Sequence, residues 1–265
     1  MKIMKPFYLI ALIICIALSY TDALAKDGAD ITTSVATYTP NMHAKSLTTP
    51  VAWGASDNVL FIGAGGSYPS SYSSSADGAV EMGYGIGNPK KIGMQVMVAS
   101  LDTDGWNAYS LYAHAFRELS DVSAIGMGVE SISLTKKGDT GKSFYIVYSV
   151  GVQDSHFVNK DNGHSLLYYS IGVGTGRFGN NSPEDIFYGK SKHGSYAFGS
   201  IAYEVADVFN VISDWNGLNL NVGVSKTFWL TKSIPVSVIL GAADLTNYSG
   251  DRVRGIIGVG SAVKL

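Results

Sequence analysis

The sequence predicts an all-β fold: a closed antiparallel transmembrane β-barrel of about 12 strands, with 10 to 14 strands possible. Apolar residues alternate with small or polar ones in segment after segment, which is the period-two pattern of a strand with two different faces. Charged residues are 15% of the chain and glycine is 31 of 265 residues, against averages of roughly 25% and about 7% in soluble domains. These observations favour a barrel in lipid over a soluble sheet.

Residues 1–25 have the pattern of a secretory signal peptide. Lys2 and Lys5 precede an apolar run over 7–18, and Ala23 and Ala25 form a small-x-small cleavage site. The run is too short for a spanning helix, which needs roughly 20 residues. We therefore expect an exported protein, and the chain's one cysteine, Cys15, lies inside the signal.

Residues 26–57 are polar and rich in Ser and Thr, with a short apolar patch around Val51 to Trp53. They are interpreted as a periplasmic leader, a plug or an extra strand, and the sequence leaves all three open. The barrel itself is expected over residues 58–265.

Turn signals between the alternating runs divide this barrel region into 12 strands. The expected strands are 58–66, 77–87, 91–101, 105–117, 121–135, 143–153, 164–177, 194–205, 207–214, 217–229, 233–245 and 252–265. Asn216-Gly217 predicts a type I′ hairpin turn, whereas no Gly or Pro marks the division at 205–207. Strand 58–66 is expected to pair with 252–265 and close the sheet.

The lengths of the connections predict how the barrel is oriented. With both termini in the periplasm, the short segments 88–90, 118–120, 206 and 230–232 fall on the periplasmic side, where turns are short. The longer connections 67–76, 136–142, 178–193 and 246–251 then lie outside, and 67–76 and 178–193 are expected to be surface loops. Segment 154–163 breaks the pattern, because it is long on the periplasmic side.

The two faces of the strands suggest two environments. Ile92, Met94, Val96 and Val98 alternate with small or amide-bearing residues, and we expect the apolar face to meet lipid and the other face to line a crowded or modestly wet lumen. Aromatic residues near strand ends, among them Trp106, Trp215, Phe228 and Trp229, are expected to form interfacial girdles. The alternative is a soluble β core filled by the same residues.

The face assignment also predicts which polar side chains line the lumen. The candidates are Glu81, Gln95, His114, Glu130, Gln153, Glu204 and Arg254. Such groups line a water path in an open barrel, or pair across a narrow one and fill it. The sequence leaves both possibilities open.

Catalytic, metal and nucleotide sites are not expected. His164-Ser165 and His114 with Ser110 carry no hydrolase signature, and the glycine alternation at 172–176 lacks the helix that a nucleotide fingerprint requires. We predict no cofactor and no metal site, and a net charge of −2 provides no basic surface for nucleic acid.

Three segments support this fold by resemblance. Residues 77–89 (DGAVEMGYGIGNP) resemble a strand and turn of poorly characterised bacterial outer-membrane β-barrel proteins. Residues 213–223 (SDWNGLNLNVG) are distantly similar to a hairpin of barrels linked to exopolysaccharide export, which usually carry Asp-Gly where this chain has Asn-Gly. The last strand resembles the C-terminal signal read by the barrel-assembly machinery, except that it ends on Leu265 in place of an aromatic residue.

The expected function is a small pore or passive conduit without catalysis in the outer membrane of a Gram-negative bacterium. The expected partners are outer-membrane lipid and the barrel-assembly machinery. The alternative is a structural or adhesion barrel with a closed lumen, which makes its contacts through the surface loops.

Overall fold

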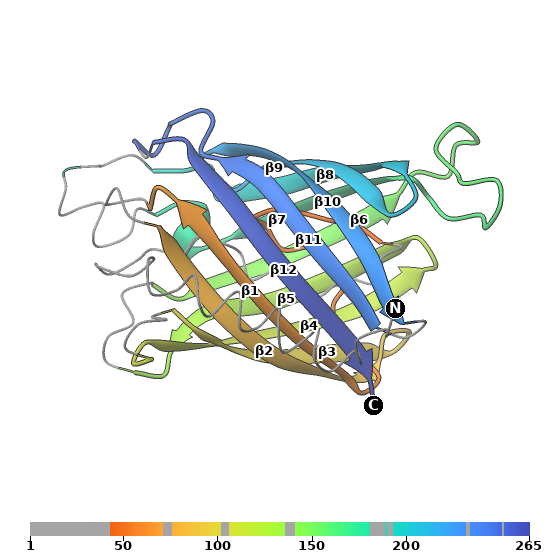
Figure 1. The fold of residues 1–265 in the computed structure, drawn as a ribbon, viewed down its shortest axis with the longest axis horizontal. Helices are drawn as coiled ribbons and strands as arrows, with labels where there is room; N and C mark the ends of the chain where they lie inside the picture. The colour runs from red at the N-terminus through yellow and green to blue at the C-terminus, as the bar shows by residue number, and fades with distance from the viewer. Residues whose placement is uncertain are drawn as a thin grey trace, which may run out of the picture.

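The protein is a closed 12-stranded antiparallel β-barrel (Figure 1). The computed structural model describes residues 43–70, 76–101, 106–135, 141–180, 189, 193–231, 234–250 and 252–265. The strands are β1 (Val59–Tyr68), β2 (Asp77–Asn88), β3 (Ile92–Ser100), β4 (Tyr109–Ser120), β5 (Ser123–Ser133), β6 (Ser143–Gly151), β7 (Leu167–Gly174), β8 (Ala197–Ala206), β9 (Phe209–Trp215), β10 (Leu220–Thr231), β11 (Ile234–Ala243) and β12 (Arg254–Lys264). Each pairs with its sequence neighbours, and β1 pairs with β12. The predicted fold, strand number and closing pair are confirmed.

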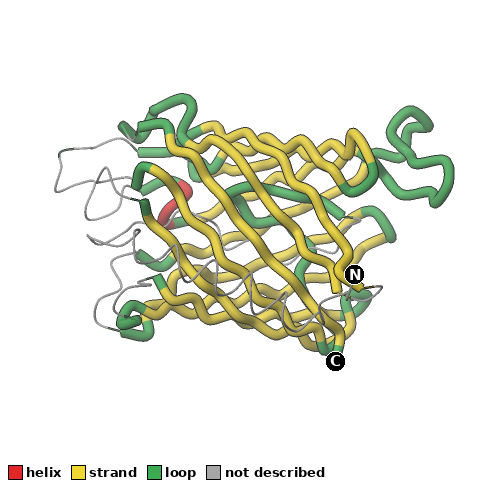
Figure 2. The backbone as a smooth tube through the Cα atoms, in the orientation of Figure 1, coloured by secondary structure: helices red, strands yellow, loops and turns green. Residues whose placement is uncertain are grey.

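The barrel has two unlike ends. One end, called the termini end below, holds Asn58, Leu265 and the connections after β2, β4, β6, β8 and β10. The opposite, distal end holds the connections after β1, β3, β5, β7, β9 and β11. Figure 2 shows the long loop after β6 projecting at the termini end, on the same side as the C-terminus. Among the described residues, no helix is both long and apolar enough to cross a membrane.

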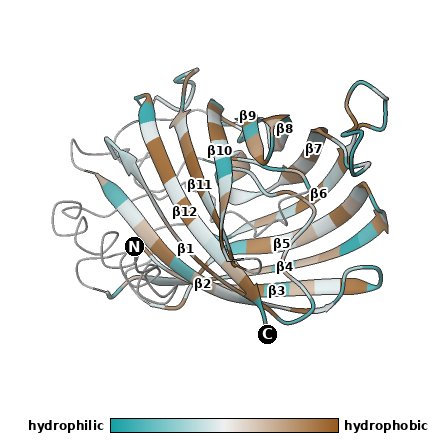
Figure 3. Ribbon diagram, turned by 45° about the vertical axis from the view of Figure 1, so that its right-hand side comes forward, coloured by the Kyte–Doolittle hydropathy of each residue, from teal (hydrophilic) through white to brown (hydrophobic). Residues whose placement is uncertain are grey.

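The strand faces alternate as the period-two pattern requires. In β3, Ile92, Met94, Val96 and Val98 are exposed, whereas Gly93, Gln95, Met97 and Ala99 are buried. Figure 3 shows brown apolar bands interrupted by white and teal bands of lower hydropathy along several strands. The exposed apolar residues of the other strands continue this belt, which includes Met82, Ile146, Ile171, Val173, Ile201, Val211, Val222, Leu240 and Ile257.

Exposed aromatic residues lie at both edges of this belt. The distal end carries Tyr68, Trp106, Phe144, Tyr196 and Tyr248, and the strand residues near the termini end are Tyr84, Tyr148, Tyr169, Tyr203 and Phe228. Aromatic girdles at both interfaces are a property of barrels that cross a membrane.

Two turns differ from what the sequence suggests. Gly217 has φ +100°, but Asn216 is not among the residues with positive φ, so the turn after β9 is not type I′. Instead, Asn216 Oδ1 accepts hydrogen bonds from the backbone N–H groups of Leu218 and Asn219. Between β8 and β9 the chain turns without glycine, because Val208 adopts φ +44° and its N–H donates to the Glu204 carboxylate.

Several sequence interpretations concern segments outside the described residues. They include the signal peptide at 1–25, residues 26–42 and most of the predicted surface loops at 71–75 and 181–188.

Candidate functional site in the barrel lumen

Residues 43–57 form no strand, and all but the last two run inside the barrel, with Asp57 exposed at its rim. His43 contacts Tyr168 near the termini end, residues 46–48 reach Asp214 near the distal end, and Asp57 N–H donates to the Gly87 carbonyl back at the termini end. This stretch, called the lumen loop below, therefore enters and leaves at the same end. Most of its residues between 44 and 55 are buried.

Asp214 holds the tip of the lumen loop. Its carboxylate accepts hydrogen bonds from the backbone N–H groups of Leu47 (2.8 Å) and Thr48 (2.7 Å) and from the hydroxyls of Ser46 (2.7 Å) and Thr48 (2.9 Å). Asn221 Nδ2 donates a further bond of 2.6 Å. The Asp214 side chain is 2% exposed, so these five donors replace the water that a carboxylate otherwise requires.

A chain of amides connects this anchor to a buried ion pair. Asn221 Nδ2 donates to Asp214 and to the Thr48 hydroxyl, while Asn221 Oδ1 accepts from the Asp244 N–H. Asp244 accepts from Asn219 Nδ2 (3.0 Å) and from Arg254 Nε (2.7 Å). Because every member is buried, the network fixes the distal part of β9 to β12 around the loop tip.

The returning half of the lumen loop bonds to the opposite wall. Ala52 N–H donates to the Ser149 hydroxyl (2.9 Å), and Ala55 N–H donates to Gln95 Oε1 (2.7 Å). The Ala52 carbonyl accepts from His114 Nε2 at 3.1 Å. A carbonyl only accepts, so Nε2 carries the proton, and Nδ1 accepts from the Tyr145 hydroxyl at 2.8 Å.

Glycines in the wall make room for this half. A Cβ at Gly85 would lie 2.2 Å from the Ala55 carbonyl carbon, and one at Gly126 would lie 2.9 Å from the Ala52 carbonyl oxygen. The loop backbone therefore approaches the wall at positions that only glycine permits.

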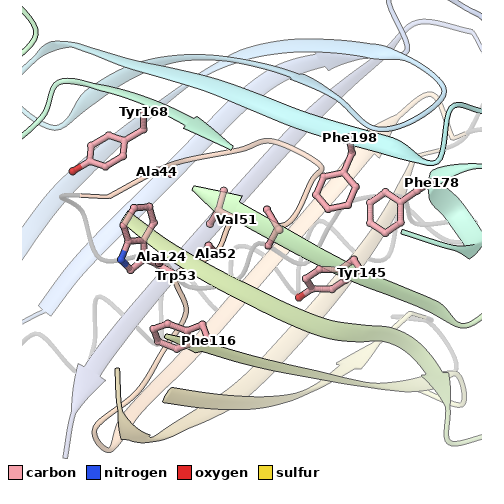
Figure 4. Packing of buried hydrophobic residues seen from close by; sticks show 11 residues of the cluster. Ala44, Val51, Ala52, Trp53, Phe116, Ala124, Tyr145, Tyr168, Phe178 and Phe198 are labelled. Atoms are coloured by element: carbon pink, nitrogen blue, oxygen red, sulfur yellow. The ribbon is translucent and has the colours of Figure 1, made fainter. Parts of the chain in front are cut away.

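Aromatic packing fills the space beside the loop (Figure 4). Trp53 stacks on His43 with ring centroids 4.6 Å apart and meets Tyr168 edge-on at 5.7 Å. Phe178 stacks on Phe198 at 4.3 Å, and both contact Tyr145. Residues 43–53 are thus held by apolar burial as well as by hydrogen bonds.

Phe178 also corrects one expectation about the outer loops. Segment 178–193 was predicted to be a surface loop, but Phe178 is fully buried. A short 3₁₀ helix, η2 (Gly176–Phe178), follows β7 and turns inward. Arg177 Nε donates to Glu130 at 2.5 Å, and its guanidinium lies 4.3 Å from the centre of the Phe178 ring.

Most of the predicted lumen residues lie on the inner face. Gln95 and His114 hold the lumen loop, Glu130 pairs with Arg177, and Arg254 pairs with Asp244. Glu81 and Glu204 face inward and are partly buried, and Glu204 is close enough to Lys45 of the loop for electrostatic attraction. Gln153 does not line the lumen, because β6 ends at Gly151 and Gln153 is exposed in the loop that follows.

The structure adds four residues that the sequence reasoning missed: Ser149, Arg177, Asp214 and Asn221. Asp214 and Asn221 lie within the 213–223 run, whose alternation does place them on the inner face. Nothing local in the sequence indicates that residues 46–48 bind them. Arg177 was missed because the strand was expected to continue to 177.

The histidine and serine pairs form no catalytic arrangement. Both ring nitrogens of His114 are bonded to groups other than Ser110, and Ser165 donates to the carbonyls of Val152 and Leu167. No cluster of three His, Cys, Asp or Glu side chains suited to a metal ion occurs in the described part of the chain.

The loop between β6 and β7, residues 152–166, projects into solvent at the termini end. Phe157 packs edge-on against Tyr203 at 6.1 Å, and Val158 forms an isolated bridge with Ser165. The backbone N–H and the imidazole of His156 donate to Asp154 and hold the pKa of that carboxyl below its usual value. These contacts lie outside the lumen.

Comparison with known proteins gives similarity at the level of structure. No protein-family model and no curated protein sequence matches the chain. Among solved structures, it is similar to the KdgM porin (TM-score 0.47, 10% identity, covering 78% of this chain and 99% of that one). It is also similar to the NanC porin (TM-score 0.45, 12% identity, covering 77% of this chain and 100% of that one). A third similar structure is the outer membrane phospholipase A from Escherichia coli (TM-score 0.44, 9% identity, covering 78% of this chain and 96% of that one).

Similarity of this degree carries no conclusion about activity. The resemblance of residues 213–223 to barrels linked to exopolysaccharide export stays a prediction. Because barrels of one architecture serve as pores and as enzymes, the chemistry is decided by the side chains of the lumen and the loops.

Proposed function

We propose that the protein is an outer-membrane pore whose lumen is occupied by its own residues 43–57. The exposed apolar belt and the two sets of aromatic residues support insertion in a membrane. The alternating C-terminal strand, with Ile257 and Leu265 exposed on its outer face, supports recognition by the barrel-assembly machinery.

The observation that carries the proposal is the way in which the lumen loop is held. It enters and leaves at one end, and hydrogen bonds and side-chain packing hold it in place. A segment held in this way can withdraw without unfolding the barrel, since the β1–β12 seam does not include it. Its withdrawal would expose the polar side chains that hold it, Ser149, Asp214 and Asn221, beside the aromatic side chains of the inner wall.

Conductance in planar bilayers tests the proposal, with Asp214→Asn as the perturbation. Asn is uncharged and has one acceptor oxygen in place of two, so either the donors that now bind Oδ2 or those that bind Oδ1 are left facing an NH2 group. Hydrogen bonds to a charged group contribute about 1.5–3 kcal/mol each, and 1.4 kcal/mol corresponds to roughly tenfold in an equilibrium constant. The open probability is expected to rise at least about tenfold.

The matched control is Asp154→Asn, the same chemical change in the exposed loop at the termini end. It is expected to leave conductance unchanged. Silence of both variants across salts and voltages, with folded barrels, would exclude a pore.

A second function is favoured by one observation. Trp53 and Phe178 are almost completely buried against the wall, which suits a barrel that is permanently closed. In that case the protein is a structural or adhesion barrel. Cross-linking to surface ligands, together with no conductance in Asp214→Asn or Asp154→Asn, would support this function.

A further inference from the structure

A row of polar side chains runs around the inner wall beneath the lumen loop. Ser149 of β6, Ser170 of β7, Ser200 of β8, Asp214 of β9 and Asn221 of β10 are register partners from one strand to the next. All five are 5% exposed or less. They form one continuous line perpendicular to the strands, which is called the polar row below.

The lumen loop bonds to both ends of this row. Residues 46–48 bond to Asp214 and Asn221, and Ala52 N–H bonds to Ser149, whose hydroxyl also lies 2.7 Å from that of Ser170. Residues 46–52 therefore bridge the row from β9 and β10 to β6.

Half of these contacts recognise backbone. The donors are the N–H groups of Leu47, Thr48 and Ala52, with added contacts from the Ser46 and Thr48 hydroxyls. Ser46 Oγ also accepts from the Thr49 N–H at 3.1 Å, so the bound segment is a turn. Since every non-proline residue offers a backbone N–H, the row can hold other turns that carry hydroxyls at the same two positions. The midpoint of the row can form a further hydrogen bond, because the buried Ser200 hydroxyl has no hydrogen-bond partner.

We propose that the polar row is a binding site for a polypeptide that arrives from the termini end and turns at Asp214, as residues 46–49 do, and that residues 46–52 occupy it as a competitor in the same chain. The ligand class is a peptide with two consecutive free N–H groups and neighbouring Ser or Thr hydroxyls. This deepens the proposed function by naming what regulates the pore, although binding itself requires no conduction.

The test uses the full-length chain with a weakened lumen loop and an intact wall. Thr48→Pro removes both the N–H and the hydroxyl that bind Asp214, and leaves every residue of the polar row unchanged. A fluorescent peptide with the sequence of residues 43–56 is then titrated against the folded variant, and binding is followed by anisotropy. Saturable binding is expected, and the same peptide with proline at position 48 is expected to bind at least tenfold more weakly.

Two wall variants of the Thr48→Pro chain test whether the peptide binds at the polar row. Asp214→Asn is expected to lower peptide affinity at least tenfold. Ser200→Ala, in the same row but without a hydrogen bond, is expected to leave affinity unchanged or raise it, because a buried hydroxyl without a partner contributes no net binding.

The outcomes separate this inference from the proposed pore. If Thr48→Pro prevents folding, the double variant Ser46→Ala, Thr48→Ala serves as the weakened chain. No saturable binding to a folded weakened chain, or equal affinity with Asp214→Asn, would overturn the inference. Peptide binding without conductance in any variant would instead overturn the pore and leave the peptide site standing.

Discussion

Replacing Gly85 by alanine would displace the lumen loop without replacing any polar side chain of the wall. The added Cβ would lie 2.2 Å from the Ala55 carbonyl carbon and 2.4 Å from the Ser56 nitrogen. Carbon atoms pack at about 3.5–4.0 Å, so the loop backbone must move by more than about 1 Å at this point. The hydrogen bond from Ala55 N–H to Gln95, now 2.7 Å long, does not survive such a movement.

The size of the effect follows from the cost of overpacking. An extra methyl in a well-packed interior costs about 1–3 kcal/mol, and the cost here falls on the state with the loop inside. The fraction of molecules with the loop withdrawn is expected to rise roughly five- to 150-fold. Gly260→Ala is the matched control, because Gly260 also faces inward but a Cβ there finds its nearest neighbour at 3.5 Å.

Thiol labelling measures the withdrawn fraction. The chain's single cysteine, Cys15, lies in the predicted signal peptide, so Ala52→Cys adds one reporter at a position that is completely buried. Maleimide labelling of this cysteine is expected to accelerate with Gly85→Ala and not with Gly260→Ala. Equal protection in the two variants, with both barrels folded, would refute the view that the loop occupies the lumen in contact with β2.

Three further substitutions test the barrel itself. Arg177→Met leaves the nearly buried Glu130 carboxylate without its partner, and is expected to lower the free energy of unfolding in urea by about 3–5 kcal/mol. The double variant Arg177→Met, Glu130→Gln is expected to restore part of this loss, and equal losses in the two variants would contradict the pairing. Val208→Gly relieves a positive φ that is strained for a β-branched residue, and is expected to stabilise the barrel by up to about 1 kcal/mol. Val211→Gly in β9 is expected to destabilise it, and a loss of stability at both positions would argue against strain at Val208. Ile171→Arg on the outer face is expected to cost about 2–4 kcal/mol in lipid vesicles, and an effect no larger than that of Ile171→Ala would argue against lipid contact.

The sequence predicts the barrel well because its information is local. Alternation in segments such as Ile92 to Val98 assigns both the strand and its outward face, and the same alternation predicts that Gln95 and His114 face the lumen. The prediction that Gln153 lines the lumen is wrong, because alternation does not show where a strand ends. Asn216-Gly217 marked a real turn, but its conformation is set by the Asn216 side chain.

The lumen loop was not predictable in the same way. Residues 43–57 have no periodicity, and their contacts with Asp214 connect positions 166–168 residues apart in the chain. Only two hints exist in the sequence: the apolar patch around Trp53 within a polar leader, and an inner face rich in Gly and Ser that leaves space for an occupant. Neither says which segment fills the space.

The return of residues 43–57 to the end at which they enter also bears on assembly. A segment that passed right through the barrel would have to be in place before the first and last strands join, or be threaded end first through the closed wall. A segment that folds back needs neither, because it can enter and leave through one open end of the finished barrel. The wall can therefore be completed first and its interior filled afterwards, and the same path remains available in reverse throughout the life of the protein.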